Sequence, residues 1–168
     1  MMHGYDHSGQ NLSGWLAQEK MDGCRAFWTG EKLITRSARL IQNVPAGMLA
    51  ELQALGEKAD CELWAGRDLG LEPARLAAQD YSWHPALVLM VFDLPSRAST
   101  PAAERLAAVA ALPAGQFVKP TSFWTIEHTE HAKLCRRAVH MGGGEGLMVR
   151  NPSGKYKDGR RECLLKLK

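Results

Sequence analysis

The stretch QEKMDGCRAF, residues 18–27, places Lys20 and Arg25 on either side of an Asp-Gly pair, between two runs that are typical of strands. Asp-Gly is a favoured two-residue turn between antiparallel strands, so Asp22-Gly23 predicts a hairpin. One interpretation is that the charged flanks only keep this turn solvated. The other is that the hairpin points a reactive lysine and an arginine at the same ligand.

Length and composition are those of an ordinary globular protein. The chain has 168 residues, of which 45% are hydrophobic and 23% charged, which predicts one domain, residues 1–168, with a real core. The longest apolar run, residues 86–92, is too short to cross a bilayer, and the first residues lack the regions of a secretory signal. We therefore expect a cytoplasmic protein with no membrane contact.

Basic residues gather at the C-terminal end. From Arg150 to Lys168 there are seven basic and two acidic residues, whereas the net charge of the whole chain is only +3. Such a segment favours a polyanion partner, either nucleic acid or nucleotide phosphate. The four cysteines are scattered without a C-x-x-C pair, which favours reduced thiols over a zinc cluster or a disulfide framework.

Apolar periodicity predicts alternating elements without repeats. Helices are expected over residues 48–55, from about 100 to 112, and over 125–141, where a run of three glycines follows. Strands are expected near residues 14–20, 25–29, 32–36, 58–64, 86–93, 116–121, 145–150 and 161–168. Short strands joined by tight turns favour a mixed sheet over a doubly wound parallel one, so the fold class is α+β.

Charged side chains recur on the faces of these strands. The period of two puts Asp60, Glu62 and Trp64 on one face of their strand, and it puts Lys166 and Lys168 together on one face of the last strand. Glu145 begins another strand beside a glycine. A solvent-exposed sheet face is the simple interpretation, but acids that punctuate buried strands need partners.

Five short motifs, in order along nearly the whole chain, carry a resemblance to the covalent nucleotidyltransferases. They are KMDGCR at 20–25, DCEL at 60–63, FD at 92–93, EGLM at 145–148 and LKLK at 165–168. The fuller strings resemble most closely the adenylation domain of the small bacterial ATP-dependent DNA ligases. The resemblance implies largely antiparallel mixed sheets flanked by helices, a nucleotidyltransferase (ATP-grasp-like) adenylation domain.

The resemblance also implies a reaction. Lys20 would attack the α-phosphate of ATP, expel pyrophosphate and hold AMP through a phosphoramide bond, with Asp22 in the same catalytic motif. The site must favour the free amine of this lysine, and a bound metal, Lys166 and Lys168 would do so. The two lysines would also neutralise charge that builds on the phosphate in the transition state.

Further roles follow from the same resemblance. Glu145 and Glu62 would bind Mg²⁺, and Glu62 is equally suited to accept a hydrogen bond from a ribose hydroxyl. The residues expected to bind the nucleotide alongside Lys20, Lys166, Lys168 and Glu62 are Gln18, Glu19, Arg25, Phe92 and Met148. Phe92 would stack on adenine, with plain core packing as the alternative. Met148 would close the other side of the base, although strict alternation places it opposite Glu145.

The implied partner is nicked double-stranded DNA, bound by a monomer that serves replication, repair or recombination. Contacts to DNA are expected from Arg25, Arg36, Arg39 and Arg150, with Arg36 receiving the 5′-phosphate of the nick. Family ligases continue into an OB-fold, whereas this sequence stops at Lys168. We expect no OB-fold, in either an isolated catalytic domain or a naturally minimal ligase.

Two other interpretations stay open. An RNA ligase or an mRNA-capping guanylyltransferase would use the same lysine chemistry on RNA ends or with GTP. A module that binds a nucleotide or a DNA end without turnover belongs to a different class of function. The presence of every charged residue that the chemistry requires favours an enzyme.

Overall fold

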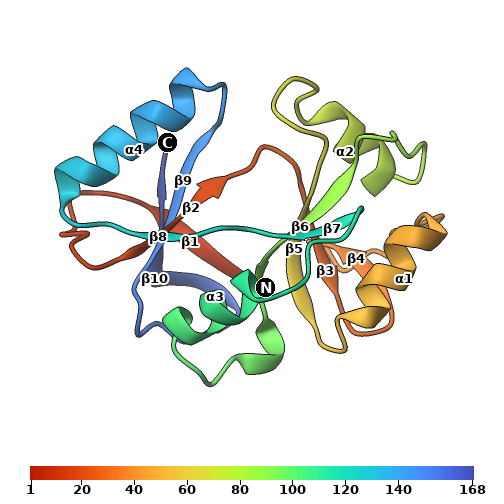
Figure 1. The fold of residues 1–168 in the computed structure, drawn as a ribbon, viewed down its shortest axis with the longest axis horizontal. Helices are drawn as coiled ribbons and strands as arrows, with labels where there is room; N and C mark the ends of the chain where they lie inside the picture. The colour runs from red at the N-terminus through yellow and green to blue at the C-terminus, as the bar shows by residue number, and fades with distance from the viewer. The chain divides into compact units, whose positions relative to one another are not determined.

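The computed structural model describes residues 1–168, which form two compact units. Unit 1 comprises Met1–Met21, Arg97–Ala107 and Ser122–Lys168, and unit 2 comprises Asp22–Ser96 and Ala108–Thr121. Each unit has its own five-stranded sheet (Figure 1). None of the helices is long and apolar enough to span a bilayer.

The sheet of unit 1 has the strand order β1-β10-β9-β2-β8. Its strands are β1 (Met2–Asp6), β2 (Leu16–Lys20), β8 (Trp124–Thr125), β9 (Gly146–Arg150) and β10 (Gly159–Leu167). Only β1 and β10 run parallel; the other pairs are antiparallel. Helix α4 (Thr129–Met141) lies against β9 (Figure 1). The sheet is thus mixed and largely antiparallel, as expected.

The alternation of buried and partly exposed side chains along β9 and β10 shows which face of this sheet packs against the core. Leu147 and Val149 of β9 and Leu165 and Leu167 of β10 are buried in one cluster, to which α4 contributes Ala132. The residues between them therefore lie on the opposite face, because successive side chains of a strand alternate. That opposite face carries the polar residues of interest.

The sheet of unit 2 has the strand order β4-β3-β5-β6-β7. Its strands are β3 (Cys24–Trp28), β4 (Leu33–Thr35), β5 (Ala59–Trp64), β6 (Val88–Asp93) and β7 (Val118–Pro120), of which only β6 and β7 run parallel. Helix α1 (Ala46–Ala54) contacts β7, and α2 (Glu72–Ala78) contacts β3 and β5. A short 3-10 turn, Pro95–Arg97, precedes α3 (Ala102–Ala110), which contributes residues to both units.

Every strand predicted from the sequence is present, and the predicted helices correspond to α1, α3 and α4. Three elements were not predicted. Strand β8 has two residues and β1 contains a glycine, so neither shows a period of two over a useful length. Helix α2 has only seven residues and a proline in its first turn.

The predicted hairpin at Asp22-Gly23 is wrong. Strand β2 pairs with β8 and β9, and β3 pairs with β4 and β5, so the Asp-Gly pair links two different sheets. Gly23 is required for another reason: a Cβ there would overlap the carbonyl oxygen of Leu63 and lie 2.9 Å from the Cγ of Glu62. The glycine thus permits the backbone to approach β5 closely.

Candidate active site

Lys20, Glu145 and Lys168 form one charged cluster in unit 1. Lys20 ends β2 and pairs across the sheet with Gly146, the first residue of β9, so its side chain lies beside the residue that precedes β9. Lys20 Nζ donates to Glu145 Oε2, and Lys168 Nζ lies 2.7 Å from Glu145 Oε1. The structure therefore brings together the expected nucleophile, one expected metal ligand and one of the two expected motif lysines.

Glu145 reaches this position because of the glycine that follows it. Gly146 has φ of 143°, outside the range that other residues adopt readily. A Cβ at Gly146 would also overlap the carbonyl oxygen of Leu167 on β10. The regular alternation of β9 therefore begins only after Gly146, which frees the Glu145 side chain to turn toward Lys20.

The Glu145 carboxylate is held in its ionised form. Its side chain is 25% exposed. Burial raises its pKa, but hydrogen bonds from Lys168 and Lys20 outweigh burial, and the pKa lies below the usual value of 4.5. At neutral pH this carboxylate is an anion shared by two ammonium groups.

A row of three side chains lies on the same face as Lys20. Gln18 of β2 pairs with Met148 of β9, and Met148 pairs with Lys166 of β10, so the three are direct cross-strand neighbours. Gln18 is buried, and Lys166 Nζ lies 3.3 Å from Asp6 Oδ1. Strict alternation from Glu145 predicted that Met148 lies on the opposite face. That prediction is wrong, because Met148 lies on the same face as Lys20.

Glu19 points the other way. It pairs with Leu147, a core residue beneath α4, so its side chain is on the face opposite Lys20. Its carboxylate lies beside Gly144, where a Cβ would be 3.0 Å from Glu19 Oε1. The expected contact of the Glu19 side chain with a nucleotide on the Lys20 face is not supported by this placement.

Unit 2 contains a second cluster, built on Arg25, Asp60 and Phe92. Arg25 Nε and Nη2 lie 2.9 Å and 2.5 Å from the two carboxylate oxygens of Asp60, which is fully buried. The guanidinium carbon of Arg25 is 5.3 Å from the centre of the Phe92 ring. A two-pronged ion pair fixes the arginine plane, and the ring is held in contact with it.

Phe92 and Glu62 lie on the face of this sheet away from the core cluster. The cluster takes Cys61 and Leu63 from β5 and Leu89 and Val91 from β6, and Phe92 does not belong to it. Glu62 pairs across the strands with Arg25 and is half-buried. This placement favours a role for Phe92 other than plain core packing.

The two carboxylates expected to bind Mg²⁺ lie in separate parts of the structure. No three His, Cys, Asp or Glu side chains anywhere in residues 1–168 group to form a metal cage. Glu145 and Glu62 belong to different units, and each is a single carboxylate. Mg²⁺ typically takes one or two protein carboxylates and completes its shell with water and substrate phosphates, so a single carboxylate such as Glu145 fits this ion.

The arginines expected to contact DNA differ in their surroundings. Arg36 is exposed after β4, as the expectation requires. Arg39 Nη1 lies 2.5 Å from Asp80 Oδ2, whose other oxygen accepts from the Gln42 backbone 2.8 Å away, so Arg39 holds a loop. Arg150 is only 3% exposed, because it ends β9 between buried neighbours on β2 and β10, and this placement does not favour its expected contact with DNA.

Sequence reasoning missed two acidic partners. Asp6 lies beside Lys166, but the strand that carries it was not predicted. Asp80 accepts hydrogen bonds from Arg39 and from the Gln42 backbone, and its φ of 65° could not be predicted from the sequence. Asp22, expected in the catalytic motif, is exposed.

Comparisons with known proteins agree with the motifs. The chain is 31% identical to the DNA ligase of Haemophilus influenzae (strain Rd), covering all of this chain and 62% of that protein. A solved structure of a Lig E DNA ligase matches with 27% identity and a TM-score of 0.78, over 100% of this chain and 69% of that one. The Chlorella virus DNA ligase-adenylate shares the fold, with 22% identity and a TM-score of 0.80. The match covers 99% of this chain and 66% of that one.

The resemblance to the ATP-dependent DNA ligases is confirmed. No family model matches the chain. The α+β fold with mixed sheets is that of the catalytic part of these ligases. The chain spans 62% of the length of the curated ligase that it matches.

Proposed function

We propose that this chain carries the adenylate-forming site of an ATP-dependent DNA ligase, with Lys20 as the nucleophile. The observation that carries the proposal is the cluster in unit 1, where Lys20 and Lys168 share the carboxylate of Glu145. A lysine at a strand end, beside a carboxylate and a second ammonium group, has the groups that attack on a phosphate needs.

In the proposed first step, Lys20 Nζ loses a proton to solvent and attacks the α-phosphorus of ATP. A P–N bond forms, the P–O bond to the β-phosphate breaks, and pyrophosphate leaves. Lys20 Nζ donates to Glu145 in the structure, so it has to exchange that partner before it attacks. Lys166 and Lys168 stabilise the charge that builds on the phosphate oxygens.

Mg²⁺ is the metal that the donor set fits. Glu145 would hold it, with Glu62 as the second candidate ligand, and the ion would neutralise negative charge on the phosphates of ATP. The Glu145 carboxylate, which accepts a hydrogen bond from Lys20 in the structure, would be the group that holds the ion.

The remaining roles concern the nucleoside and the second substrate. Phe92 would stack on adenine, Glu62 would accept a ribose hydroxyl, and Gln18 and Met148 would contact the base. AMP would then pass from Lys20 to the 5′-phosphate of nicked DNA, and attack by the adjacent 3′-hydroxyl would release AMP and seal the strand. Arg36, an exposed cation, is the proposed contact to the 5′-phosphate.

Intact-protein mass spectrometry after incubation with Mg²⁺ and either ATP or GTP tests the first step. We expect the added mass of one AMP with ATP, and no adduct with GTP. Labelling by GTP alone would favour a capping-type enzyme, and no labelling would favour a binding module. Incubation of the labelled protein with nicked DNA and with nicked RNA then separates a DNA ligase from an RNA ligase.

A further inference from the structure

Unit 1 contains a pocket that the motif lysines share with residues of β1 and α4 to which the proposed reaction gives no role. The cavity, about 420 Å³, lies where the ends of β1 and β10 meet α4. It is lined by Asp6 and His7, by Thr129, Lys133 and Arg136 of α4, and by Lys166, Leu167 and Lys168. Four of these residues are basic and one is acidic, so the lining is strongly positive.

Arg136 is the member of this lining whose charge is least compensated. Its Nη1 donates to the carbonyl oxygen of Lys168 at 2.8 Å, and its Nε is buried without a hydrogen-bond partner. No carboxylate side chain pairs with it, whereas Lys133 pairs with Glu130, Lys166 with Asp6 and Lys168 with Glu145. A buried donor on a guanidinium group is costly unless an acceptor reaches it.

Arg136 lines the pocket together with two other residues of α4. Thr129, Lys133 and Arg136 follow one another at helical spacings of four and three, so they share one side of α4 and line one wall of the pocket. An arginine with no carboxylate partner, beside a second cation, is suited to a phosphate, whose oxygens accept several hydrogen bonds at once.

We propose that this pocket binds a phosphate group, with the Arg136 guanidinium and Lys133 Nζ as its donors on α4. The proposal deepens the proposed function, because Lys166 and Lys168 line the pocket as well. The phosphate has two possible sources: the pyrophosphate that leaves in the first step, or a backbone phosphate of the DNA. Either source places a second anion site next to the charge cluster of Lys20.

The test is binding of inorganic pyrophosphate and of short duplex DNA to the whole ¹⁵N-labelled chain, without ATP, at constant ionic strength. The readout is the Arg136 Nε–H signal in the NMR spectrum, assigned by its absence in Arg136→Gln. Because no step of adenylylation is involved, the proposed function can fail while this site binds, and the reverse also holds.

We expect the Arg136 signal to shift and saturate with at least one of the two probes. Lys133→Gln, a change at an exposed residue, should weaken binding of that probe about tenfold, since one charge-assisted contact is lost. Arg137→Gln is the matched control, because Arg137 is the exposed neighbour on the same helix and does not line the pocket. It should change the affinity by less than about twofold.

The two probes distinguish the source of the phosphate. Saturation by pyrophosphate that DNA does not displace assigns the leaving group, and saturation by DNA with competition from pyrophosphate assigns the backbone. The proposal is overturned if neither probe shifts the Arg136 signal. It is also overturned if Lys133→Gln and Arg137→Gln weaken binding equally, which is the behaviour of a diffuse surface charge.

Discussion

Lys168 Nζ lies 2.7 Å from Oε1 of Glu145, and the other oxygen of that carboxylate accepts a hydrogen bond from Lys20. One anion thus joins the end of β10 to the end of β2 through the residue that precedes β9. Removal of the carboxylate would leave two ammonium groups close together without a counter-charge. The cluster therefore links the stability of unit 1 to the chemistry proposed for it.

Glu145→Gln is expected to slow self-adenylylation by a factor of about 10²–10³, the size of effect common for a preorganised electrostatic group. The rate is measured by the time course of AMP addition in intact-protein mass spectra at saturating ATP. Glu162→Gln is the control, because Glu162 is an exposed carboxylate on β10. Equal rates in both variants would mean that Glu145 has no part in the reaction.

The lowered pKa of Glu145 predicts a pH dependence of stability. Ionised Glu145 binds two ammonium groups in the folded state, so its contribution is fully present above the unfolded pKa, near 4.5, and is lost as the pH falls through the lower folded pKa. The difference in unfolding free energy between wild type and Glu145→Gln should be constant at neutral pH and should shrink in acid. Urea titrations at several pH values measure it, and a difference that grows on acidification would contradict the ion pairs.

Asp60→Ala is expected to destabilise unit 2 by about 3–5 kcal/mol, because it leaves the Arg25 guanidinium without its buried partner. Urea denaturation followed by tryptophan fluorescence measures the loss. Asp68→Ala, at an exposed position, should change stability by less than about 0.5 kcal/mol. If the two substitutions cost the same, the Arg25–Asp60 pair has no structural role.

Gly146→Ala is expected to reduce both stability and adenylylation, because the added Cβ overlaps the Leu167 carbonyl and opposes the φ that directs Glu145 toward Lys20. Gly143→Ala separates these effects, since Gly143 also has a positive φ, of 79°, but no neighbour within 4 Å of a Cβ. It should cost only about 1 kcal/mol and leave the rate unchanged. Equal losses of rate in the two variants would argue against the positioning of Glu145 by Gly146.

Much of the fold and of the charged cluster could be predicted from local patterns. Period-two alternation predicted the buried face of β10 correctly, because Leu165 and Leu167 are both in one core cluster. The motifs that carry the ligase resemblance include Lys20, Glu145 and Lys168, which the structure brings together. Short-range periodicity can predict the buried face of a strand because successive side chains alternate between the two faces of the sheet, and only one face is packed against the core.

Pairing between distant strands could not be predicted in the same way. Asp-Gly is a strong local turn signal, yet the strands on either side of it pair with partners far away in the sequence and belong to different sheets. Asp6 meets Lys166 only because β1 runs parallel to β10, at the other end of the chain. The local propensities of a segment cannot predict contacts with segments that are far away in the sequence.

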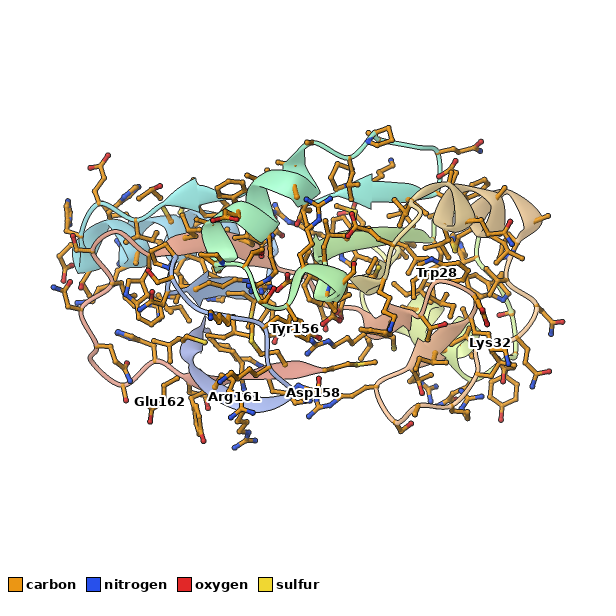
Figure 2. All side chains as sticks on the ribbon, turned by 90° about the horizontal axis from the view of Figure 1, so that it is seen from below. Trp28, Lys32, Tyr156, Asp158, Arg161 and Glu162 are labelled. Atoms are coloured by element: carbon orange, nitrogen blue, oxygen red, sulfur yellow. The ribbon has the colours of Figure 1, made fainter.

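Charge composition predicted the exposure of some, but not all, basic residues of the C-terminal segment. It grouped Arg150 with surface cations, but Arg150 is buried. Figure 2 labels Tyr156, Asp158, Arg161 and Glu162, which lie before and at the start of β10. Asp158, Arg161 and Glu162 are exposed, whereas Tyr156 is buried in a small cluster with Met2 and Leu164.

The most direct test of the central claim is the position of the AMP adduct. After incubation with ATP and Mg²⁺, the protein is digested under conditions that preserve the P–N bond, and the peptides are sequenced by mass spectrometry. We expect AMP on Lys20 alone, and no adduct in Lys20→Arg, which keeps the charge but not the nucleophilic amine. AMP on Lys166, Lys168 or another residue, or undiminished labelling of Lys20→Arg, would contradict the assignment of Lys20 as the nucleophile.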